Sequence, residues 1–388
     1  MRRVSTPAVR RRGSLIPAVA VALLIVGAAA AIALDRLWID AARIELLTAA
    51  ESAALAGAAQ LADDRQLATV VDVRERLAEV RTAAVTAAAQ NYVAGQPLRV
   101  PTTDVHIGRL VQDRTGREVF LETDNAPTSV AVFAARQRSG ANPVALFLRT
   151  LTKAQRPLVQ VSAEASIDNR VVGVAAIQGG SIPALPLAAL EIDPSGVQPQ
   201  TWVRQIEEHG GADQFGYDQA SGLVINQPDG LPELTLLSAP LSASSGTATP
   251  TNVRLLDFAT GLRDDRLAAQ VAAGLRPADL VASNGVLRFD GLPLLIGCES
   301  QIEPATRQAL AAAIGQPRIC CVFSAVAGNT SAVSVPRMVA VRVMSVREVD
   351  SERVEIIVQP TVVTTRTAIF AANAEVANPY VYKLQLTH

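Results

Sequence analysis

The clearest pattern in the chain is an apolar run over residues 15–34, LIPAVAVALLIVGAAAAIAL, which contains no charged side chain. Twenty residues in a helix extend about 30 Å, which matches the hydrocarbon core of a bilayer. Pro17 falls in the first turn of this helix, where its missing backbone N–H is tolerated. The pattern therefore predicts one transmembrane helix over residues 15–34.

The helical pattern continues beyond this span. Residues 35–62 contain no proline, and their apolar positions recur at helical spacing: Leu37, Ile44, Leu47, Ala50, Ala54 and Ala58. The segment is rich in alanine and glycine, which would let a partner helix approach closely. Alanine is also the best helix former, so the same composition fits an ordinary helix. We predict one long helix, half in the membrane and half outside it.

A second amphipathic helix is predicted after Asp63 and Asp64, within residues 64–95, ended by Gly95 and Pro97. It completes a helical region over residues 35–95, and we expect it to fold back on the body. Apolar residues then alternate with polar ones, which predicts a β-rich domain over residues 96–200. Its expected strands cover residues 105–111, 117–123, 129–135, 144–150 and 159–167. The proline-rich segment 179–200 is interpreted as an extended strap or connection.

The C-terminal part, residues 201–388, has a mixed pattern. Irregular structure is expected up to about residue 252, with a loop at about 226–252. The pattern then predicts helices over residues 263–275 and 303–315, and strands over 252–258, 285–291, 317–327, 338–349, 353–363 and 381–388. The expected fold class is α+β: an N-terminal transmembrane helix that continues into an exported helix, followed by a mixed, strand-rich ectodomain.

Charge is distributed unevenly around the span. All charge before residue 15 comes from Arg2, Arg3, Arg10, Arg11 and Arg12, and the other 30 of the 35 basic residues face 36 acidic ones. A basic tip therefore joins an acidic body, which excludes a protein that coats nucleic acid. By the positive-inside rule, Arg10, Arg11 and Arg12 keep residues 1–14 in the cytoplasm, and the body after residue 34 is exported.

A cleaved signal peptide is the alternative to a retained anchor. Small residues at Ala29-Ala30-Ala31 or Ala31-Ile32-Ala33 would suit the cleavage enzyme. The apolar run is longer than the roughly 7–15 residues of a usual signal-peptide core, which favours the anchor.

Side chains for catalysis or metal binding are few. The histidines are His106, His209 and His388; none shares a helical face with a second metal ligand, and each is interpreted as a solvent or turn residue. The GxSxG, Walker-A and GxGxxG patterns are absent from the sequence. We therefore predict a non-catalytic protein with no metal, no cofactor and no evident small-molecule substrate.

Two weaker signals concern single segments. Asp193 and Ser195 follow an apolar run and resemble the start of the metal site of von Willebrand A domains, but Val197 replaces the second serine, so an Asp-Pro-Ser-Gly turn is favoured. In an exported protein Cys298 could form a disulfide with Cys320 or Cys321. Alternatively, the adjacent cysteines serve as small core residues of a strand.

Residues 12–61 resemble the N-terminal module of the TadG-like family, which is associated with assembly of Flp (tight adherence) pili. The matching residues are Arg12-Gly13, the span that ends at Asp35, Arg43, and the segment AAESAALAGAAQL with Ala53, Ala54, Ala56 and Gly57. Glu51, Ser52 and Thr48 are conservative departures. More loosely, residues 125–151 and the IPALPLA segment at 182–188 are similar to later parts of longer TadG-like proteins.

This resemblance implies a single-pass component of the bacterial inner membrane that takes part in pilus biogenesis, with other assembly proteins contacting its Ala/Gly-rich helix. One alternative is a minor pilin or pseudopilin, in which Gly13-Ser14 would mimic a prepilin-peptidase site. That alternative lacks the early glutamate of a mature pilin, because position 18 is Ala18. Another is an exported, membrane-anchored enzyme or ligand-binding protein.

Overall fold

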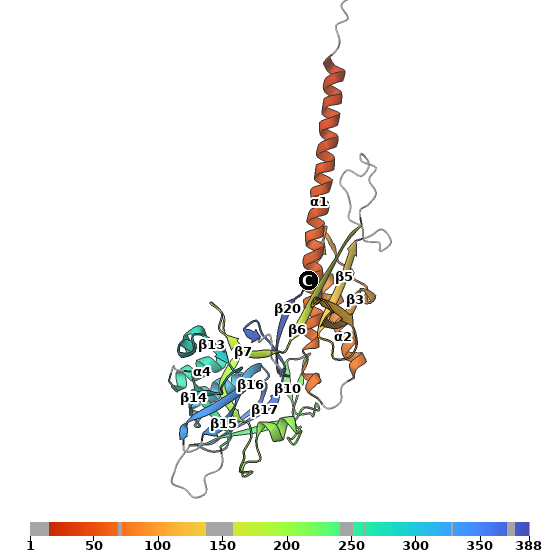
Figure 1. Cartoon of the computed structure of the whole chain (residues 1–388). Helices are drawn as coiled ribbons and strands as arrows, with labels where there is room; N and C mark the ends of the chain where they lie inside the picture. Colours follow the sequence, from red (N-terminus) through yellow and green to blue (C-terminus); the bar gives the residue numbers. More distant parts are fainter. Residues whose placement is uncertain are drawn as a thin grey trace, which may run out of the picture.

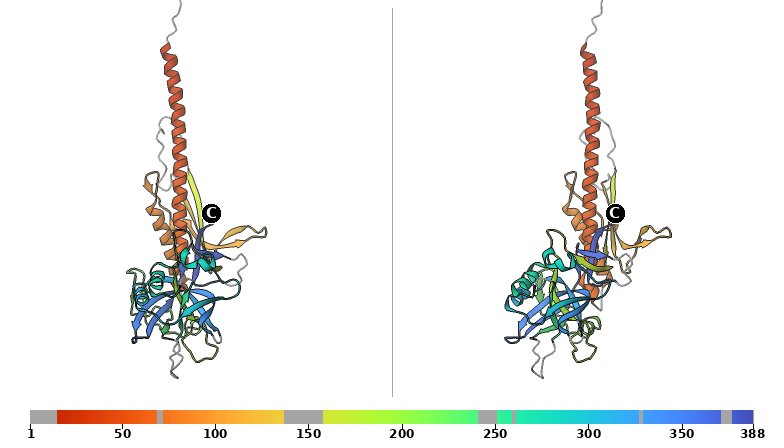
Figure 2. Two further views of the ribbon diagram at one scale, coloured as in Figure 1. Left: turned by 90° about the vertical axis from the view of Figure 1, so that its left-hand side faces the viewer. Right: turned by 60° about the vertical axis from the view of Figure 1, so that its left-hand side comes forward.

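The computed structural model describes residues 15–68, 72–136, 158–240, 251–258, 261–326, 329–370 and 377–387. A long helix projects from a body with two β-sheet units, each with its own hydrophobic core (Figure 1). Both units lie at the C-terminal end of this helix, as the two views in Figure 2 also show. The fold is α+β, as the sequence predicts.

The projecting helix is α1 (Leu15–Leu61), and it has no break where the predicted span ends. Residues 15–30 are exposed on every side, whereas from Ala42 onward one face is buried in the core of the N-terminal unit. One continuous helix confirms the prediction that the apolar run and the segment after it form a single element.

The second predicted helix is shorter than expected. A 3₁₀ turn, η1 (Asp64–Leu67), comes first, and α2 covers only Val73–Gln90. The carboxylate of Asp72 accepts the backbone N–H groups of Arg74 and Glu75 at 2.9 and 3.2 Å, and this N-cap sets where α2 begins. The expected last turn is instead a small hairpin, β1 (Tyr92–Val93) and β2 (Gln96–Pro97).

Helices α1 and α2 cover one face of a six-stranded sheet with the order β18-β20-β6-β5-β3-β4. The predicted strands at 105–111, 117–123, 129–135 and 159–167 are confirmed, whereas 144–150 lies outside the described residues. The strands and the turn before β3 are η2 (Thr102–Asp104), β3 (Val105–Gln112), β4 (Glu118–Glu122), β5 (Ser129–Arg136), β6 (Val159–Asp168), β18 (Val363–Thr364) and β20 (Val381–Leu386).

The C-terminal unit is built on a seven-stranded sheet with the order β11-β17-β16-β14-β12-β8-β15. An additional pairing of β15 with β16 closes part of this sheet into a barrel of β16, β14, β12, β8 and β15. The strands are β8 (Ala184–Leu190), β11 (Leu234–Ser238), β12 (Val253–Asp257), β14 (Leu294–Glu299), β15 (Pro317–Val326), β16 (Asn329–Glu348) and β17 (Val354–Pro360).

Smaller elements decorate this barrel, and the two helices predicted here are present. A three-stranded sheet has the order β13-β7-β19, and a hairpin pairs β9 with β10. These elements are α4 (Asp264–Ala273), α5 (Pro304–Ala312), the π-helical turn η4 (Val203–Glu207), η5 (Pro277–Ser283), β7 (Val171–Ala175), β9 (Gly216–Asp218), β10 (Leu223–Ile225), β13 (Val286–Arg288) and β19 (Ala368–Phe370).

The proline-rich strap is the clearest correction to the sequence analysis. Its residues 184–190 form β8, a strand buried along its whole length between β12 and β15. Pro186 is tolerated there because pairing with β12 begins at Leu187 and the register with β15 is interrupted between Ile319 and Cys321. The expected irregular stretch 201–252 likewise contains η4, β9, β10 and β11; its residues 241–250 lie outside the described structure.

The two units do not divide at residue 200. Strands β7 and β8 precede that position and belong to the C-terminal core, whereas β20, at the end of the chain, pairs with β6 in the N-terminal sheet. The chain therefore leaves the N-terminal unit before β7, forms the C-terminal unit, and returns to the N-terminal sheet with β20. The two units are thus connected both before and after the residues that form the barrel.

Candidate functional site

The first candidate feature is the free part of α1. It is the one helix in the described part of the chain that is long and apolar enough to cross a membrane, and it lies near the N-terminus. Large apolar side chains are exposed along it, including Leu15 and Leu24 at 78% and 74%. Such a surface is unfavourable in water and fits a lipid environment. Arg10, Arg11 and Arg12, the predicted orientation signal, lie outside the described residues.

The family-like helix residues have a different role from the expected one. Ala53, Ala54 and Gly57 are buried inside the chain's own N-terminal unit, whereas Ala56 is half-buried and Arg43 exposed. A Cβ atom at Gly57 would lie 3.1 Å from Val130 Cγ1 and 3.2 Å from Ala84 Cβ. The small residues thus let α1 approach α2 and β5 closely, so this face is not free for a partner protein. Asp35, at the end of the span, is also buried.

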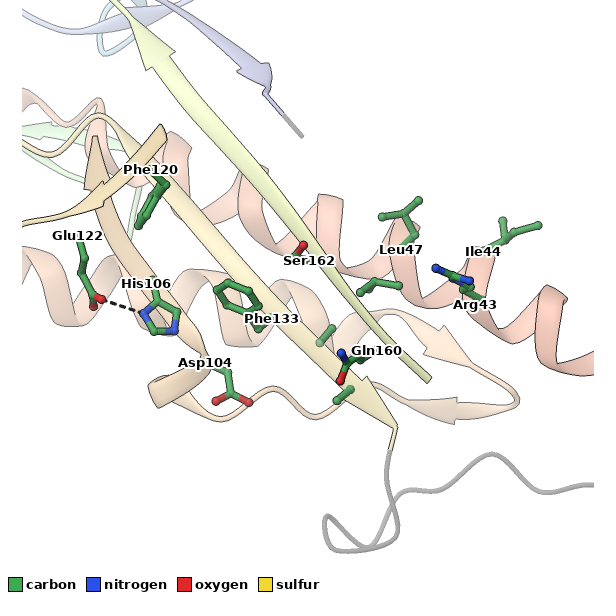
Figure 3. Close-up of a pocket in the computed structure, with 13 residues that line it drawn as sticks. Arg43, Ile44, Leu47, Asp104, His106, Phe120, Glu122, Phe133, Gln160 and Ser162 are labelled. Carbon is green, nitrogen blue, oxygen red and sulfur yellow. Dashed lines mark hydrogen bonds and ion pairs between the residues drawn. The ribbon is translucent and has the colours of Figure 1, made fainter. Parts of the chain in front are cut away.

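The second feature is a groove of about 1010 Å³ between the exposed side of α1 and the N-terminal sheet (Figure 3). Ile44 and Leu47 of α1 form one wall, and strands β3 to β6 form the other. The ring of Phe133 is 49% exposed and meets the imidazole of His106 edge-on, with ring centroids 5.2 Å apart. The opposite side of that imidazole contacts Glu122, with 3.1 Å between Nδ1 and Oε2.

This groove combines aromatic, aliphatic and charged side chains. Ser162, on β6, also lines the groove and pairs with Phe133 on the neighbouring strand β5. His106 lies on β3, two strands away from Ser162. The serine and histidine are therefore separated by a whole strand and do not form a nucleophile–base pair. The groove suits recognition of another polypeptide, because aromatic side chains with a polar rim are typical of protein interfaces.

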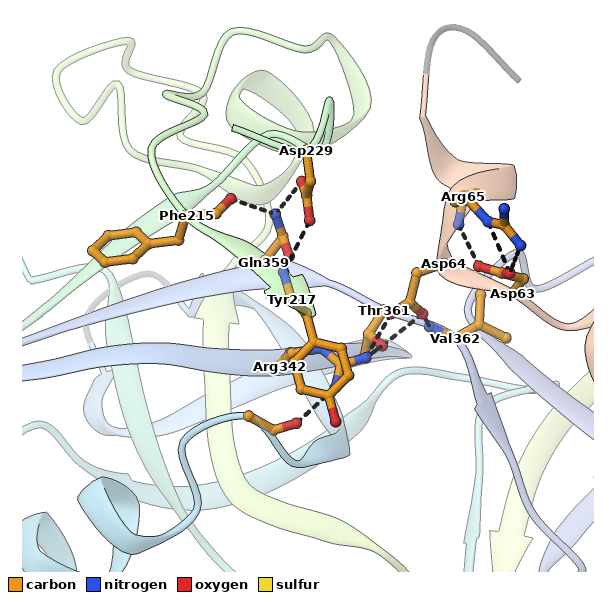
Figure 4. A network of polar contacts seen from close by, with 11 residues as sticks. Asp63, Asp64, Arg65, Phe215, Tyr217, Asp229, Arg342, Gln359, Thr361 and Val362 are labelled. Atoms are coloured by element: carbon orange, nitrogen blue, oxygen red, sulfur yellow. Dashed lines mark hydrogen bonds and ion pairs between the residues drawn. The ribbon is translucent and has the colours of Figure 1, made fainter. Parts of the chain in front are cut away.

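The third feature is a junction between η1, the turn that follows α1, and the barrel (Figure 4). Asp64 of η1 accepts Arg342 Nη2 at 2.6 Å with one carboxylate oxygen. With the other oxygen it accepts the hydroxyl of Thr361 and the backbone N–H of Val362 at 2.7 and 2.6 Å. Three donors, one of them charged, thus bind one carboxylate from the opposite unit.

The arginine of this junction is held from several sides. Only 5% of Arg342 is exposed, its Nη1 donates to the Gly315 carbonyl at 2.6 Å, and its guanidinium lies 3.6 Å from the ring centre of Tyr217. The sequence places Asp63 and Asp64 before the second predicted helix but carries no signal for a partner 278 residues away. Asp63 does cap η1, accepting the backbone N–H of Arg65 at 2.9 Å.

Several carboxylates lie around the hairpin of β9 and β10, which carries Tyr217, and Glu233 is the buried one. Glu233 is 4% exposed, and its Oε1 accepts the backbone N–H groups of Gln214 and Phe215 at 2.9 and 2.5 Å. Burial raises the pKa of Glu233, and the charges of Asp213 and Asp229 raise it further. Partial desolvation also raises the pKa of Asp229, which is otherwise exposed, and its Oδ1 accepts Gln359 Nε2 at 2.8 Å.

We expect Glu233→Gln to change the pH dependence of stability. A carboxyl with a raised folded-state pKa is destabilising once ionised, so wild-type stability falls as pH rises from the unfolded-state pKa through the folded-state pKa. The amide oxygen of glutamine can still accept both backbone N–H groups. Urea unfolding at several pH values should therefore show the variant gaining on the wild type as pH rises from 4 to 8, about the range in which carboxyls titrate. A constant difference across that range would contradict the assignment.

The three cysteines lie in the core of the C-terminal unit. Cys298, Cys320 and Cys321 are buried free thiols, so the possible disulfide is not formed, and burial raises the pKa of each thiol. The adjacent pair serves as small core residues of β15.

The predicted Asp193 turn is confirmed. Its carboxylate accepts the backbone N–H groups of Gln198 and Ser195 at 2.7 and 3.0 Å, which lower its pKa. His209 is a turn residue with φ 55°, as expected, whereas His106 is a half-buried strand residue; His388 lies outside the described residues. Within the described ranges, the His, Cys, Asp and Glu side chains form no cluster of three or more that could hold a metal ion.

Comparison with protein-family models, with curated proteins and with solved structures finds no match to this chain.

Proposed function

We propose that the protein is a single-pass structural component of a Flp/Tad-type pilus-assembly system or a related secretion apparatus. Residues 15–34 anchor it in the bacterial inner membrane, the basic tip stays in the cytoplasm, and the body is exported. The observation that carries this proposal is the unbroken α1, which is exposed over residues 15–30 and built into the body from Ala42. A rigid helix that joins span and body suits a structural part that must hold its body at a fixed height.

The assignment to a pilus-assembly system is supported by the resemblance of residues 12–61 to the TadG-like module. Because the Ala/Gly face of α1 is occupied within the chain, partner assembly proteins would contact another surface. The groove beside Ile44 and Phe133 is the best candidate, since it lies next to the membrane-proximal half of the body and keeps its aromatic ring exposed.

The anchor is tested by expressing the full chain in a bacterial host. We expect the protein to stay in membranes washed with alkaline carbonate, and its N-terminus to precede residue 15. In spheroplasts, added protease should reach the body but not a tag on the basic tip. Replacing Arg10, Arg11 and Arg12 together by glutamate should expose part of the tag population, because it removes the orientation signal. A mature N-terminus at Leu34 would instead identify a cleaved signal peptide.

A minor pilin is the second candidate, and the packing of half of α1 against an antiparallel sheet is the observation that favours it. A mature N-terminus at Ser14, together with recovery of the protein in sheared filaments, would support this function. Recovery only in the cell membrane, with an intact basic tip, supports the assembly component.

A further inference from the structure

A stripe of exposed residues follows α1 from the span into the exported half. It has seven-residue spacing with alternating steps of three and four, the a and d pattern of a coiled coil. The a positions are Ala20, Gly27, Leu34, Ala41 and Thr48, and the d positions are Ile16, Leu23, Ala30, Leu37 and Ile44. All ten residues are exposed. We refer to these ten residues as the exposed stripe.

The informative part of the exposed stripe lies outside the predicted span. Over residues 35–48 the a and d positions are apolar or threonine, while the exposed neighbours include the charged Arg36, Asp40 and Glu45. Leu37 and Ile44 are 66% and 68% exposed. Ile44 lies about 15 Å along the helix from the end of the span, at 1.5 Å per residue, so lipid tails cannot cover it.

The body leaves this side of the helix open. Ala42, Leu46 and Ala49, which pack into the N-terminal core, lie on the side of α1 nearly opposite to Leu37 and Ile44 at 3.6 residues per turn. Figure 1 shows that α1 extends well above both sheet units. A second helix can therefore run along the exposed stripe as far as Ala41, and at Ile44 it would also border the groove formed with strands β3 to β6.

We infer that two copies of this chain pair in parallel through the exposed stripe. Copies anchored by the same span have the same orientation and leave the membrane at the same height, so each a or d residue meets its own counterpart. Small a residues within the span, Ala20 and Gly27, allow the backbones to approach closely. Within the span every position is apolar, so the seven-residue spacing is distinctive only over residues 35–48, where about two repeats carry it. This inference rests on the retained anchor of the proposed function.

Charge gives the pairing a measurable signature. In a parallel pair, Asp40 at position g faces Glu45 at position e of the other copy, which opposes association through repulsion between exposed like charges. The apolar contacts at Leu37 and Ile44 must outweigh this repulsion. Asp40→Lys should then strengthen the pairing, and this gain should decrease with salt.

The test is disulfide cross-linking of the full chain in native membranes. Ala41→Cys, at position a, should give a covalent dimer under mild oxidation, whereas Arg43→Cys, an exposed position at the same height but off the exposed stripe, should give roughly tenfold less. The wild type is the background control, because its three cysteines are buried. Adding Leu37→Asp and Ile44→Asp should reduce the Ala41→Cys dimer to background. Adding Val281→Asp, an exposed apolar position on the body, should leave it unchanged.

The outcomes separate this inference from the proposed function. If the anchor is retained but Ala41→Cys and Arg43→Cys cross-link equally, the pairing is wrong and the anchor stands. Capture of Ala41→Cys by a different protein, without a homodimer, also overturns the pairing. A mature N-terminus at Leu34 removes the anchor and overturns both.

Discussion

Asp64→Ala is expected to lower the free energy of unfolding by about 3–5 kcal/mol, because it leaves the Arg342 guanidinium buried without its counter-charge. The carboxylate also accepts the Thr361 hydroxyl and the Val362 N–H, and both donors lose their partner. The measurement is urea unfolding of the full chain in detergent micelles, followed by the fluorescence of Trp202, which is completely buried in the C-terminal core.

Two further variants show whether the loss comes from the ion pair. Asp265→Ala is the matched control. In the wild type, the Asp265 carboxylate pairs with Arg263 at the surface, where both side chains are more than 60% exposed. Its loss should lower the free energy of unfolding by less than about 1 kcal/mol. Combining Asp64→Ala with Arg342→Met removes both charges and should recover part of the loss. If Asp64→Ala costs no more than the control, the junction does not hold the two units together.

Gly57→Leu has the second large expected effect. The site has no room for a side chain, since a Cβ atom alone would lie 3.1 and 3.2 Å from Val130 and Ala84. Leucine must therefore push α1 away from α2 and β5, which we expect to cost at least about 1–3 kcal/mol and to expose the small-residue face of the helix. Urea unfolding in micelles and proteolysis of the native protein both report this separation.

A graded series distinguishes crowding from helix propensity. Gly57→Ala adds only the Cβ, and the tight contacts offset the roughly 1 kcal/mol that alanine gains over glycine within a helix, so a small net change is expected. Gly291→Leu is the control, because a Cβ at Gly291 meets nothing within 4 Å. A stability of Gly57→Leu equal to that of Gly57→Ala would show that α1 does not pack as closely as the structure has it.

Together, the junction and the Gly57 contact explain how α1 is joined to the body. Gly57 fixes the helix against the N-terminal sheet, and Asp64, one turn after the end of α1, fixes η1 against the barrel. A displacement of either unit would therefore reach the helix directly. Under the proposed function, these contacts would hold the groove at a constant distance from the bilayer.

The elements that the sequence predicted well depend on local periodicity. The helix over residues 15–61 follows from an apolar run and from spacing that continues without proline, and β3, β5 and β6 follow from alternation over five or more residues. The Asp193 turn was likewise predictable, because the aspartate bonds to backbone groups only a few residues away. In these cases the residues that decide the structure are neighbours in the chain.

The features missed by the sequence depend on contacts between distant segments. β8 contains Pro186 and was interpreted as part of a strap, yet pairing with β12 and β15 makes it a buried strand. The Ala/Gly pattern of α1 indicated close packing but not the partner, which is the chain's own sheet. Local pattern along the chain is enough to predict one apolar helix continuous with an α+β body. The exposed face of that helix and the contact of Asp64 with Arg342 follow from the folded structure alone, because burial and ion pairing depend on where segments hundreds of residues apart come together.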